Sequence, residues 1–334
     1  MSKKLVIRGL YGFVLLCCLI AAGGIKTLLE SKQFVFSKFA QNSVSEVAVT
    51  PFPVSVDLQK QTITADDQLK NYSSESFAYI NIKPASWEEK IVAMFASKEW
   101  YQSLASPVSR ILVIWPGERK EEVAKDFGDI LLWKTEDRQK FLDAISSSEP
   151  SLSEGKYYPG QYVAHRDATP EEVAQLVQDK FQGDIMSRYT PEVQAKVPLE
   201  QALTVASLLE HEASDFDNMR QISGVIWNRL FDNMPLQLDA TLQYVKGSKQ
   251  GEKDWWPIPR PADKYLKSPF NTYANKGLPP APIGNPSAAA VLAALNPSPT
   301  KCMYYFHDDN HDYHCSATYE EHVAKLRATY GRGR

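Results

Sequence analysis

Apolar residues recur with helical spacing along two consecutive stretches of the chain, "PLEQALTVASLLEHEA" (198–213) and "SDFDNMRQISGVIWNRLFDN" (214–233). The first stretch is apolar through "ALTVA" (202–206), which predicts a helix buried in a core. The second carries apolar residues three or four positions apart, at Met219, Ile222, Ile226 and Leu230. We therefore predict two packed helices, the second with one apolar face.

The first half of the chain predicts a small unit of strands and helices. Alternating apolar positions indicate strands over 77–84 and 110–117. One helix is expected after Ser86, a capping-box candidate, and two more in "ERKEEVAKDFG", ending at Gly128, and "TEDRQKFLDAISSS". We expect a small α/β subdomain, LysM-like, over 76–147, serving either as a binding module or as a packing unit.

Residues 148–330 predict a second, mixed α+β domain. An aromatic strand lies in "EGKYYPGQYVAHRD", and a helix follows Thr169, with Pro170 in its first turn. Beyond residue 233, the proline-dense stretches "WWPIPRP" and "GLPPAPIGNPS" predict mostly loops and turns. A short helix (288–297), a strand (301–307) and a closing helix in "TYEEHVAKLRATY" complete the domain. The expected fold class is α+β.

The N-terminus has a different pattern. The apolar run "LYGFVLLCCLIAAGGI" (10–25) follows the basic tip "MSKKLVIR". With its flanks the run approaches the length of about 20 residues that spans a bilayer, and the positive charge before it predicts a cytoplasmic N-terminus and export of the rest. We expect a cytoplasmic tip and transmembrane anchor over 1–30 and a linker over 31–75. A cleaved signal peptide, with "AAGG" as its cleavage region, is the alternative.

Composition adds two constraints. The formal net charge is −3, so no bulk basic character suggests nucleic acid as a partner. Cys302 and Cys315 lie in the part expected to be exported, where a disulfide can persist. The sequence leaves open whether they pair or remain two buried free thiols.

Two glutamates, Glu210 and Glu212, end the helix that is expected to be buried. A carboxyl held against apolar side chains has its charged form disfavoured, which raises its pKa. A carboxylic acid that stays protonated near neutral pH can act as the general acid in cleavage of a glycosidic bond. Both acids follow apolar positions at helical spacing, so periodicity does not rank them. The simpler interpretation is that they end the helix at a solvated edge.

Several motifs resemble those of the endolytic murein transglycosylases, the YceG-like family. The resembling stretches are "EGKYYPGQY" (154–162), "ASLLEHEA" (206–213), "VIWNRLFDNMPLQLDATLQY" (225–244), "SPFNTYANKGLPPAPIGNPS" (268–287) and "YYFHDDNHDYHCSATYEEH" (304–322). They occur in the family's order over about residues 110–327. The sequence departs from the family pattern at Gly160, Gln161, Ala240 and Ser287, and "GSKQGEKDWWPIPRP" (247–261) follows none of its motifs.

The resemblance implies cleavage within peptidoglycan glycan strands, between N-acetylmuramic acid and N-acetylglucosamine, leaving 1,6-anhydro ends without a metal or other cofactor. By motif position Glu210 is the catalytic acid and base, with Glu212 as the alternative or as its partner. The resemblance also implies a single-pass protein of the bacterial cytoplasmic membrane, with its catalytic domain outside. There it would end nascent strands near peptidoglycan synthases.

Matched motif positions also suggest substrate-binding residues: Glu212, Gln237, Asp239, Asn271 and Tyr273. Amide and carboxylate side chains suit sugar hydroxyls and N-acetyl groups. Turn formation is the alternative role for Asp239 and Asn271, and core packing for Tyr273.

Other polar and aromatic residues are expected to serve structure or to line the cleft. Asn228 and Arg229 are expected to tie helix to loop. Tyr244, Trp255 and Trp256 are expected to stack on sugar faces, and for Trp255 and Trp256 cover of a loop is the alternative. The histidines of the segment 307–314 suggest zinc, but we favour a cleft-wall role for His311. His211 is expected on the helix surface.

Two further functions remain open at this level: a glycosidase that hydrolyses the strand, and a wall-binding or scaffold protein without catalysis.

Overall fold

The computed structural model describes residues 50–64, 108–148, 150, 152–213 and 215–331. The predicted anchor (1–30), the strand over 77–84 and the helix after Ser86 lie outside these residues. Within the described part, every helix is too short or too polar to cross a bilayer.

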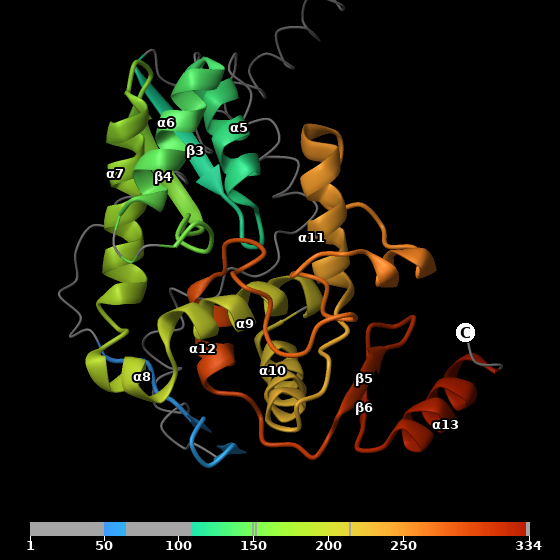
Figure 1. Ribbon diagram of the computed structural model, residues 1–334. Helices are drawn as coiled ribbons and strands as arrows, with labels where there is room; N and C mark the ends of the chain where they lie inside the picture. The colour runs from blue at the N-terminus through green and yellow to red at the C-terminus, as the bar shows by residue number, and fades with distance from the viewer. Residues whose placement is uncertain (1–49, 65–107, 149, 151, 214, 332–334) are drawn as a thin grey trace, which may run out of the picture. The chain divides into compact units, whose positions relative to one another are not determined.

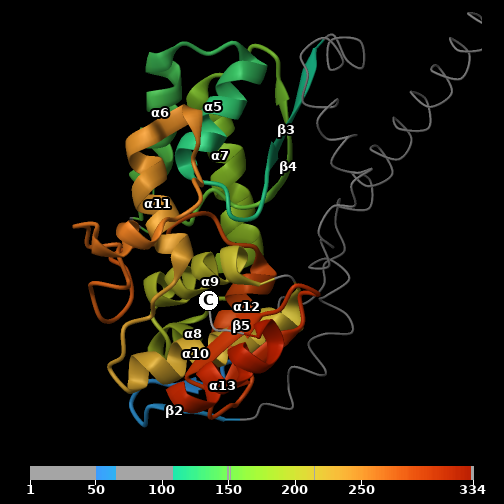
Figure 2. The ribbon, with the colours of Figure 1, turned by 90° about the vertical axis from the view of Figure 1, so that its right-hand side faces the viewer.

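A two-stranded antiparallel ribbon is the basis of the first packed layer. Strand β3 (Ser109–Ile114) pairs with β4 (Gly160–His165), so that Ser109 lies opposite His165 and Ile114 opposite Gly160. Helices α5 (Lys120–Leu131), α6 (Thr135–Ser146) and α7 (Pro170–Phe181) lie on one side of the ribbon (Figure 2). We call residues 108–181 the α/β layer.

The core of the α/β layer crosses the boundary that the sequence suggests between residues 147 and 148. Phe141 of α6 packs on Phe127 of α5 and on Tyr157, with ring centroids 5.6 and 5.8 Å apart. Tyr162 of β4 joins them, 6.3 Å from Phe127. The layer therefore continues to α7, because its ribbon pairs strands that are far apart in sequence. Its LysM-like character stays a prediction.

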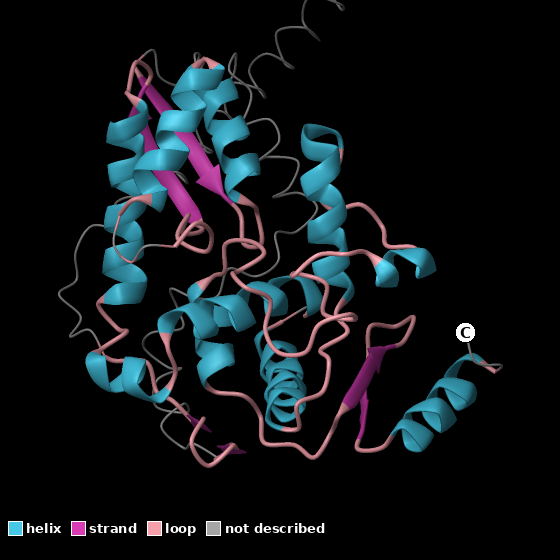
Figure 3. Ribbon diagram, in the orientation of Figure 1, coloured by secondary structure: helices cyan, strands magenta, loops and turns pink. Residues whose placement is uncertain are grey.

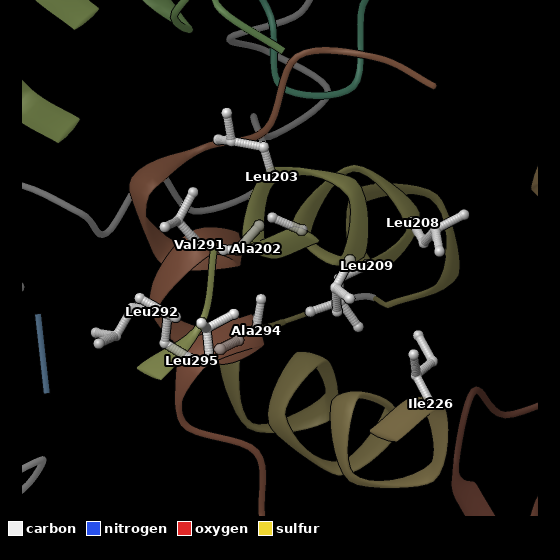
Figure 4. Close-up of a cluster of buried hydrophobic side chains, with 14 of the residues drawn as sticks. Ala202, Leu203, Leu208, Leu209, Ile226, Val291, Leu292, Ala294 and Leu295 are labelled. Atoms are coloured by element: carbon white, nitrogen blue, oxygen red, sulfur yellow. The ribbon is translucent and has the colours of Figure 1, made fainter. Parts of the chain in front are cut away.

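Helix α9 (Leu199–Glu212) runs through the second core and is buried on every side from Ala202 to Leu209. It packs between α10 (Phe216–Phe231) and α12 (Ala288–Leu295), which also contact each other. Figure 4 shows Leu209 of α9 pointing toward α10 and α12. The two packed helices expected around residues 198–233 are thus present, with α12 as a third.

The remaining elements surround this core (Figure 3). They are η1 (Gln182–Met186), α8 (Pro191–Lys196), α11 (Asp239–Gln250), η2 (Gly251–Lys253), η3 (Pro261–Tyr265), the hairpin β5 (Tyr304–His307) and β6 (Tyr313–Ser316), and α13 (Tyr319–Tyr330). Helix α11 replaces the loop expected after residue 233. A side chain at Gly247 of this helix would place its Cβ 1.8 Å from the carbonyl oxygen of Trp255, so glycine permits close packing.

The described residues 50–64 belong to the second core, which corrects the predicted linker over 31–75 in this part. Strands β1 (Val56–Asp57) and β2 (Thr62–Ile63) form a short antiparallel hairpin. Phe52 and Val56 are each only 2% exposed within the core. The Ser55 N–H donates to Leu295 O at 3.0 Å, which fixes the hairpin to the end of α12.

Replacing Phe52 by alanine should therefore destabilise the protein. Removal of a buried phenylalanine leaves a cavity and costs about 3 to 5 kcal/mol in free energy of unfolding. Urea unfolding of the full chain in detergent measures it. Gln59→Ala, at an exposed position of the same hairpin, is the control and should change the free energy by less than about 0.5 kcal/mol. Equal effects of the two substitutions would show that the hairpin adds no core packing.

Cys302 and Cys315 form a disulfide that closes the β5–β6 hairpin, with their Cα atoms 5.7 Å apart. Of the two alternatives left by the sequence, the structure has the bridge.

The Cys302→Ala/Cys315→Ala double variant should be less stable, by about 3 kcal/mol, because the bridge restricts a loop of the unfolded chain. Denaturant unfolding with and without reductant tests this. Reductant should lower the stability of the parent to that of the variant and leave the variant unchanged. A parent unaffected by full reduction would contradict the expected contribution.

Candidate active site

Both candidate acids lie at the C-terminal end of α9, where Ala213 leaves the helix in an extended conformation, with φ −118° and ψ 149°. Residues two apart in a helix point to different sides. Glu210 accordingly contacts the loop before α12, whereas Glu212 contacts β5. The two carboxyls therefore have separate environments.

Glu210 accepts a hydrogen bond from Ser287, the N-cap residue of α12. The Ser287 N–H donates to Glu210 Oε1 at 2.7 Å, and Ser287 Oγ accepts from Ala290 N at 3.2 Å as the N-cap of α12. Burial raises the pKa of Glu210, while the hydroxyl and the N–H of Ser287 oppose the rise. The pKa of Glu210 is raised overall, which favours the protonated carboxyl. When the proton leaves, the Ser287 N–H is a hydrogen-bond donor for the carboxylate.

The loop that presents Ser287 is locked to the α/β layer by Asn285, which is fully buried. Its Nδ2 donates to Glu118 O at 2.8 Å and to Glu154 Oε1 at 3.0 Å. Its Oδ1 accepts from the N–H groups of Gly155 and Tyr157, each at 3.0 Å. The side chain thus joins two of the sequence motifs, 154–162 and 268–287, which are distant in the chain.

Close backbone contact completes this junction. Gly117 N donates to Asn285 O at 2.8 Å, and a side chain at Gly284 would place its Cβ 2.4 Å from Gly117 O. Glycine at 284 is therefore required for the loop to approach the turn after β3. The loop around Glu210 is set by these contacts across the two cores.

Two acids at the junction were not singled out from the sequence. Burial raises the pKa of Glu118 and of Glu154 to about 8 in each case. Glu154, 1% exposed, also accepts from Lys120 N at 3.1 Å, at the start of α5. Glu154 lies in the matched motif "EGKYYPGQY", so its motif position was the signal that could have identified it.

His211 is not the surface residue that the sequence suggested. Its ring packs on Trp256, with centroids 3.8 Å apart, and its Nε2 lies 3.2 Å from Gly117 O. Burial lowers the pKa of His211 to about 4, so the imidazole is neutral near pH 7 and donates its Nε2 proton to this carbonyl. The segment 251–257 covers His211 through Trp256. No sequence motif predicted that this segment lies beside α9.

Glu212 has a different set of neighbours. The Tyr305 hydroxyl donates to Glu212 Oε2 at 2.8 Å. Burial raises the pKa of Glu212 to about 7, with a further rise from Asp239, while Tyr305, Ala240 N–H and Arg229 oppose it. Tyr305 was missed in the sequence because an aromatic residue in a strand is usually a packing residue.

Two of the predicted substrate-binding residues, Asp239 and Tyr273, interact electrostatically with Glu212. The Tyr273 hydroxyl donates to Asp239 Oδ1 at 2.7 Å, and Asp239 is the exposed first residue of α11. Gln237 is exposed, with φ 53°, and its N–H donates to Thr272 O at 3.1 Å. These polar groups form one partly exposed cluster beside Glu212.

Asn271, the remaining residue predicted to bind substrate, lies below the surface in the loop before Tyr273. The side chain is fully buried. Its Nδ2 donates to Lys264 O at 3.0 Å and to Leu266 O at 2.8 Å, and its Oδ1 accepts from Tyr273 N at 2.9 Å. Because its amide is occupied by backbone groups, Asn271 organises the loop that carries Tyr273.

Asn228 and Arg229 tie α10 to the segment before β5, as predicted. Asn228 Nδ2 donates to Thr300 O at 2.9 Å, and Arg229 Nε donates to Met303 O at 2.6 Å.

The aromatic residues near α11 have structural partners. The Arg119 guanidinium lies 4.1 Å from the centre of the Tyr244 ring and 5.3 Å from that of Trp255. Trp256 Nε1 donates to Glu122 Oε2 at 3.1 Å. These contacts fit the loop-cover role for Trp255 and Trp256, and stacking on sugar faces stays a prediction.

The histidine-rich segment makes pairwise contacts. His314 Nε2 lies 2.9 Å from Asp308 Oδ2, and His307 Nε2 lies 3.0 Å from Asn218 Oδ1. His311 is exposed in the turn, with φ 66°. Among the described residues, no three His, Cys, Asp or Glu side chains are grouped to hold a metal ion.

Known proteins are similar to this chain in sequence and in fold. A family profile described as the YceG-like family matches residues 53–328. The endolytic murein transglycosylase of Bacillus subtilis (strain 168) is 32% identical over 170 residues, covering 51% of this chain and 46% of that protein. The endolytic murein transglycosylase of Streptococcus pneumoniae serotype 2 (strain D39) is 23% identical, covering 89% of this chain and 60% of that protein.

A crystal structure of a YceG-like protein from Listeria monocytogenes has the same fold, with a TM-score of 0.57 and 22% identity, covering 83% of this chain and 98% of that one. The chain spans 46% and 60% of the lengths of the two curated relatives. Because the family profile covers most of its length, this chain belongs to the YceG-like family.

Proposed function

We propose that the protein is a lytic transglycosylase that cleaves within peptidoglycan glycan strands, with Glu210 as its general acid and base. The observation that carries the proposal is the Glu210 carboxyl itself, buried enough to raise its pKa and held at Oε1 by the Ser287 N–H. Membership of a family whose curated relatives are named endolytic murein transglycosylases supports it.

The reaction needs one group that first gives and then takes a proton. Protonated Glu210 donates its proton to the oxygen that links N-acetylmuramic acid to N-acetylglucosamine, and the bond from that oxygen to C1 breaks. The Glu210 carboxylate then accepts the proton of the muramic acid C6 hydroxyl while this oxygen bonds to C1. The product is a 1,6-anhydro end, and no water is consumed.

Ser287 suits the second half of this cycle. Its N–H, at the N-terminus of α12, stabilises the carboxylate that exists after the first proton transfer. Oε2 of Glu210 is then the oxygen that exchanges the proton with substrate.

Glu212 is the weaker candidate for this role. Its pKa is also raised, so the pKa does not separate the two acids. Its Oε2 accepts from Tyr305, and Arg229 and the Ala240 N–H also act on the carboxyl. We assign Glu212 to the substrate cluster with Gln237, Asp239 and Tyr273, where carboxylates can stabilise the positive charge that develops at C1.

We further propose that an N-terminal anchor holds the protein in the bacterial cytoplasmic membrane, with the catalytic part outside. Ending of nascent strands beside peptidoglycan synthases fits this location. The support is the apolar run after a basic tip in the sequence.

Glu210→Gln should abolish strand cleavage, with a loss of at least about a hundredfold, because the amide cannot donate the proton. Glu200→Gln, at an exposed position of the same helix, is the matched control and should retain activity. Products of purified glycan strands digested by the full chain in detergent are identified by mass.

The products separate the functions. Anhydro ends support a lytic transglycosylase, reducing ends would indicate a hydrolase, and no products from the parent would indicate a binding or scaffold protein. Full activity in Glu210→Gln with loss in Glu212→Gln would transfer the acid role to Glu212.

Activity should fall as pH rises through the raised pKa of Glu210, because the acid must be protonated to donate. Ser287→Ala removes a hydroxyl that lowers this pKa, so the alkaline limb of the kcat profile should move to higher pH. The limb should persist in Glu212→Gln. A limb that stays in place in Ser287→Ala and disappears in Glu212→Gln would assign the titration to Glu212 instead.

A further inference from the structure

The segment after α11 carries an excess of positive charge. Residues 246–267 contain six Lys or Arg and three Asp or Glu, although the whole chain has a net charge of −3. Five of these cations are exposed: Lys249, Lys253, Arg260, Lys264 and Lys267. Two exposed hydrophobic side chains lie among them, Ile258 at 83% and Tyr265 at 86%. We call residues 249–267 the basic loop, which projects beside α11 in Figure 1.

The basic loop is held in a defined conformation by Lys246 of α11. Lys246 Nζ donates to Ile258 O at 2.9 Å and to Asp263 Oδ2 at 2.7 Å. The same Asp263 oxygen accepts from Arg260 N at 2.6 Å. Asp263 is thereby neutralised by Lys246, so it adds no net negative charge to this surface.

The basic loop also borders the substrate cluster. Asn271 binds the carbonyl groups of Lys264 and Leu266 and fixes this arm of the loop to the chain that carries Tyr273. Lys264 Nζ lies 4.9 Å from the centre of the Tyr273 ring, and the Tyr273 hydroxyl donates to Asp239. A strand bound at Asp239 and Tyr273 would therefore have the basic loop beside it.

We propose that the basic loop binds the stem peptides of the glycan strand through their carboxylates. The inference rests on the proposed function, since it extends the same substrate from its sugars to the peptide attached to muramic acid. In a peptide-bearing strand the lactyl carboxyl of muramic acid forms the amide bond to the peptide, so the sugars carry no charge, whereas the stem peptide carries several carboxylates and methyl groups. Lysine and arginine complement the carboxylates, and Ile258 and Tyr265 offer apolar surface for the methyl groups.

Binding measured without turnover tests this inference. In the full chain with Glu210→Gln in detergent, the Kd is compared for strands bearing peptides and for strands from which an amidase has removed them, leaving one lactyl carboxylate on each muramic acid in place of the several carboxylates of the peptide. We expect the peptide-bearing strands to bind about fivefold more tightly at low salt, and this preference to shrink in high salt.

Adding Lys253→Glu/Lys267→Glu to the Glu210→Gln protein should remove most of the preference for peptide-bearing strands. Lys196→Glu/Lys301→Glu is the control, because it makes the same change in net charge at exposed positions on α8 and before β5. The control should keep the preference. Equal Kd values for the two strands in the parent, or an unchanged ratio in Lys253→Glu/Lys267→Glu, would overturn the proposal.

A second measurement separates a membrane surface from a peptide. Sedimentation with phosphatidylglycerol vesicles is measured for the parent and for both double variants. All of them carry the same N-terminal segment, so a difference in vesicle binding comes from the substitutions. Loss of vesicle binding in Lys253→Glu/Lys267→Glu with an unchanged strand preference would assign the loop to anionic lipid and overturn the proposal. The digestion experiment decides catalysis independently, because the Kd ratio requires no bond cleavage.

Discussion

Burial of α9 on every side is the constraint on which the rest of the structure depends. From Ala202 to Leu209 no position of this helix is left to solvent, so neighbours must cover its whole circumference. The helices α10, α11 and α12 contact α9 and contribute to that cover. The acids at the C-terminal end therefore leave the core at a surface that other elements already line, which explains why burial raises the pKa of both.

The end of α9 divides its two acids between different chemical environments. Glu210 meets a backbone donor at the start of α12, and Glu212 meets the hydroxyl of Tyr305 in β5. A backbone N–H cannot rotate away or ionise, so it is a fixed donor to the Glu210 carboxyl. The Tyr305 hydroxyl instead joins Glu212 to a polar cluster with an exposed edge.

Asn285 connects this site to the α/β layer. A buried amide that satisfies four backbone or side-chain partners leaves no polar atom unpaired, and it fixes the loop before Ser287 relative to the turn after β3. The α/β layer is thus part of the scaffold of the acid rather than a separate appendage. Arg119 and its aromatic neighbours bring the segment after α11 to the same junction, where Trp256 covers His211.

The sequence by itself determined the elements that depend on local spacing. The helical spacing of apolar residues and the capping residues predicted α7 after Thr169 and both α9 and α10. The order of the motifs indicated the family and the two acids. Helix α11 was not predicted, because the proline-dense stretches that follow it indicated loops and turns over the whole region beyond residue 233.

Only the tertiary structure decided what depends on residues distant in the chain. It brought β3 to β4, paired Cys302 with Cys315, buried His211 and used the Asn271 amide within its own loop. Each of these outcomes is set by contacts between segments whose separation the local pattern does not encode. For the same reason, the different partners of Glu210 and Glu212 follow from the fold and not from their positions in the helix sequence.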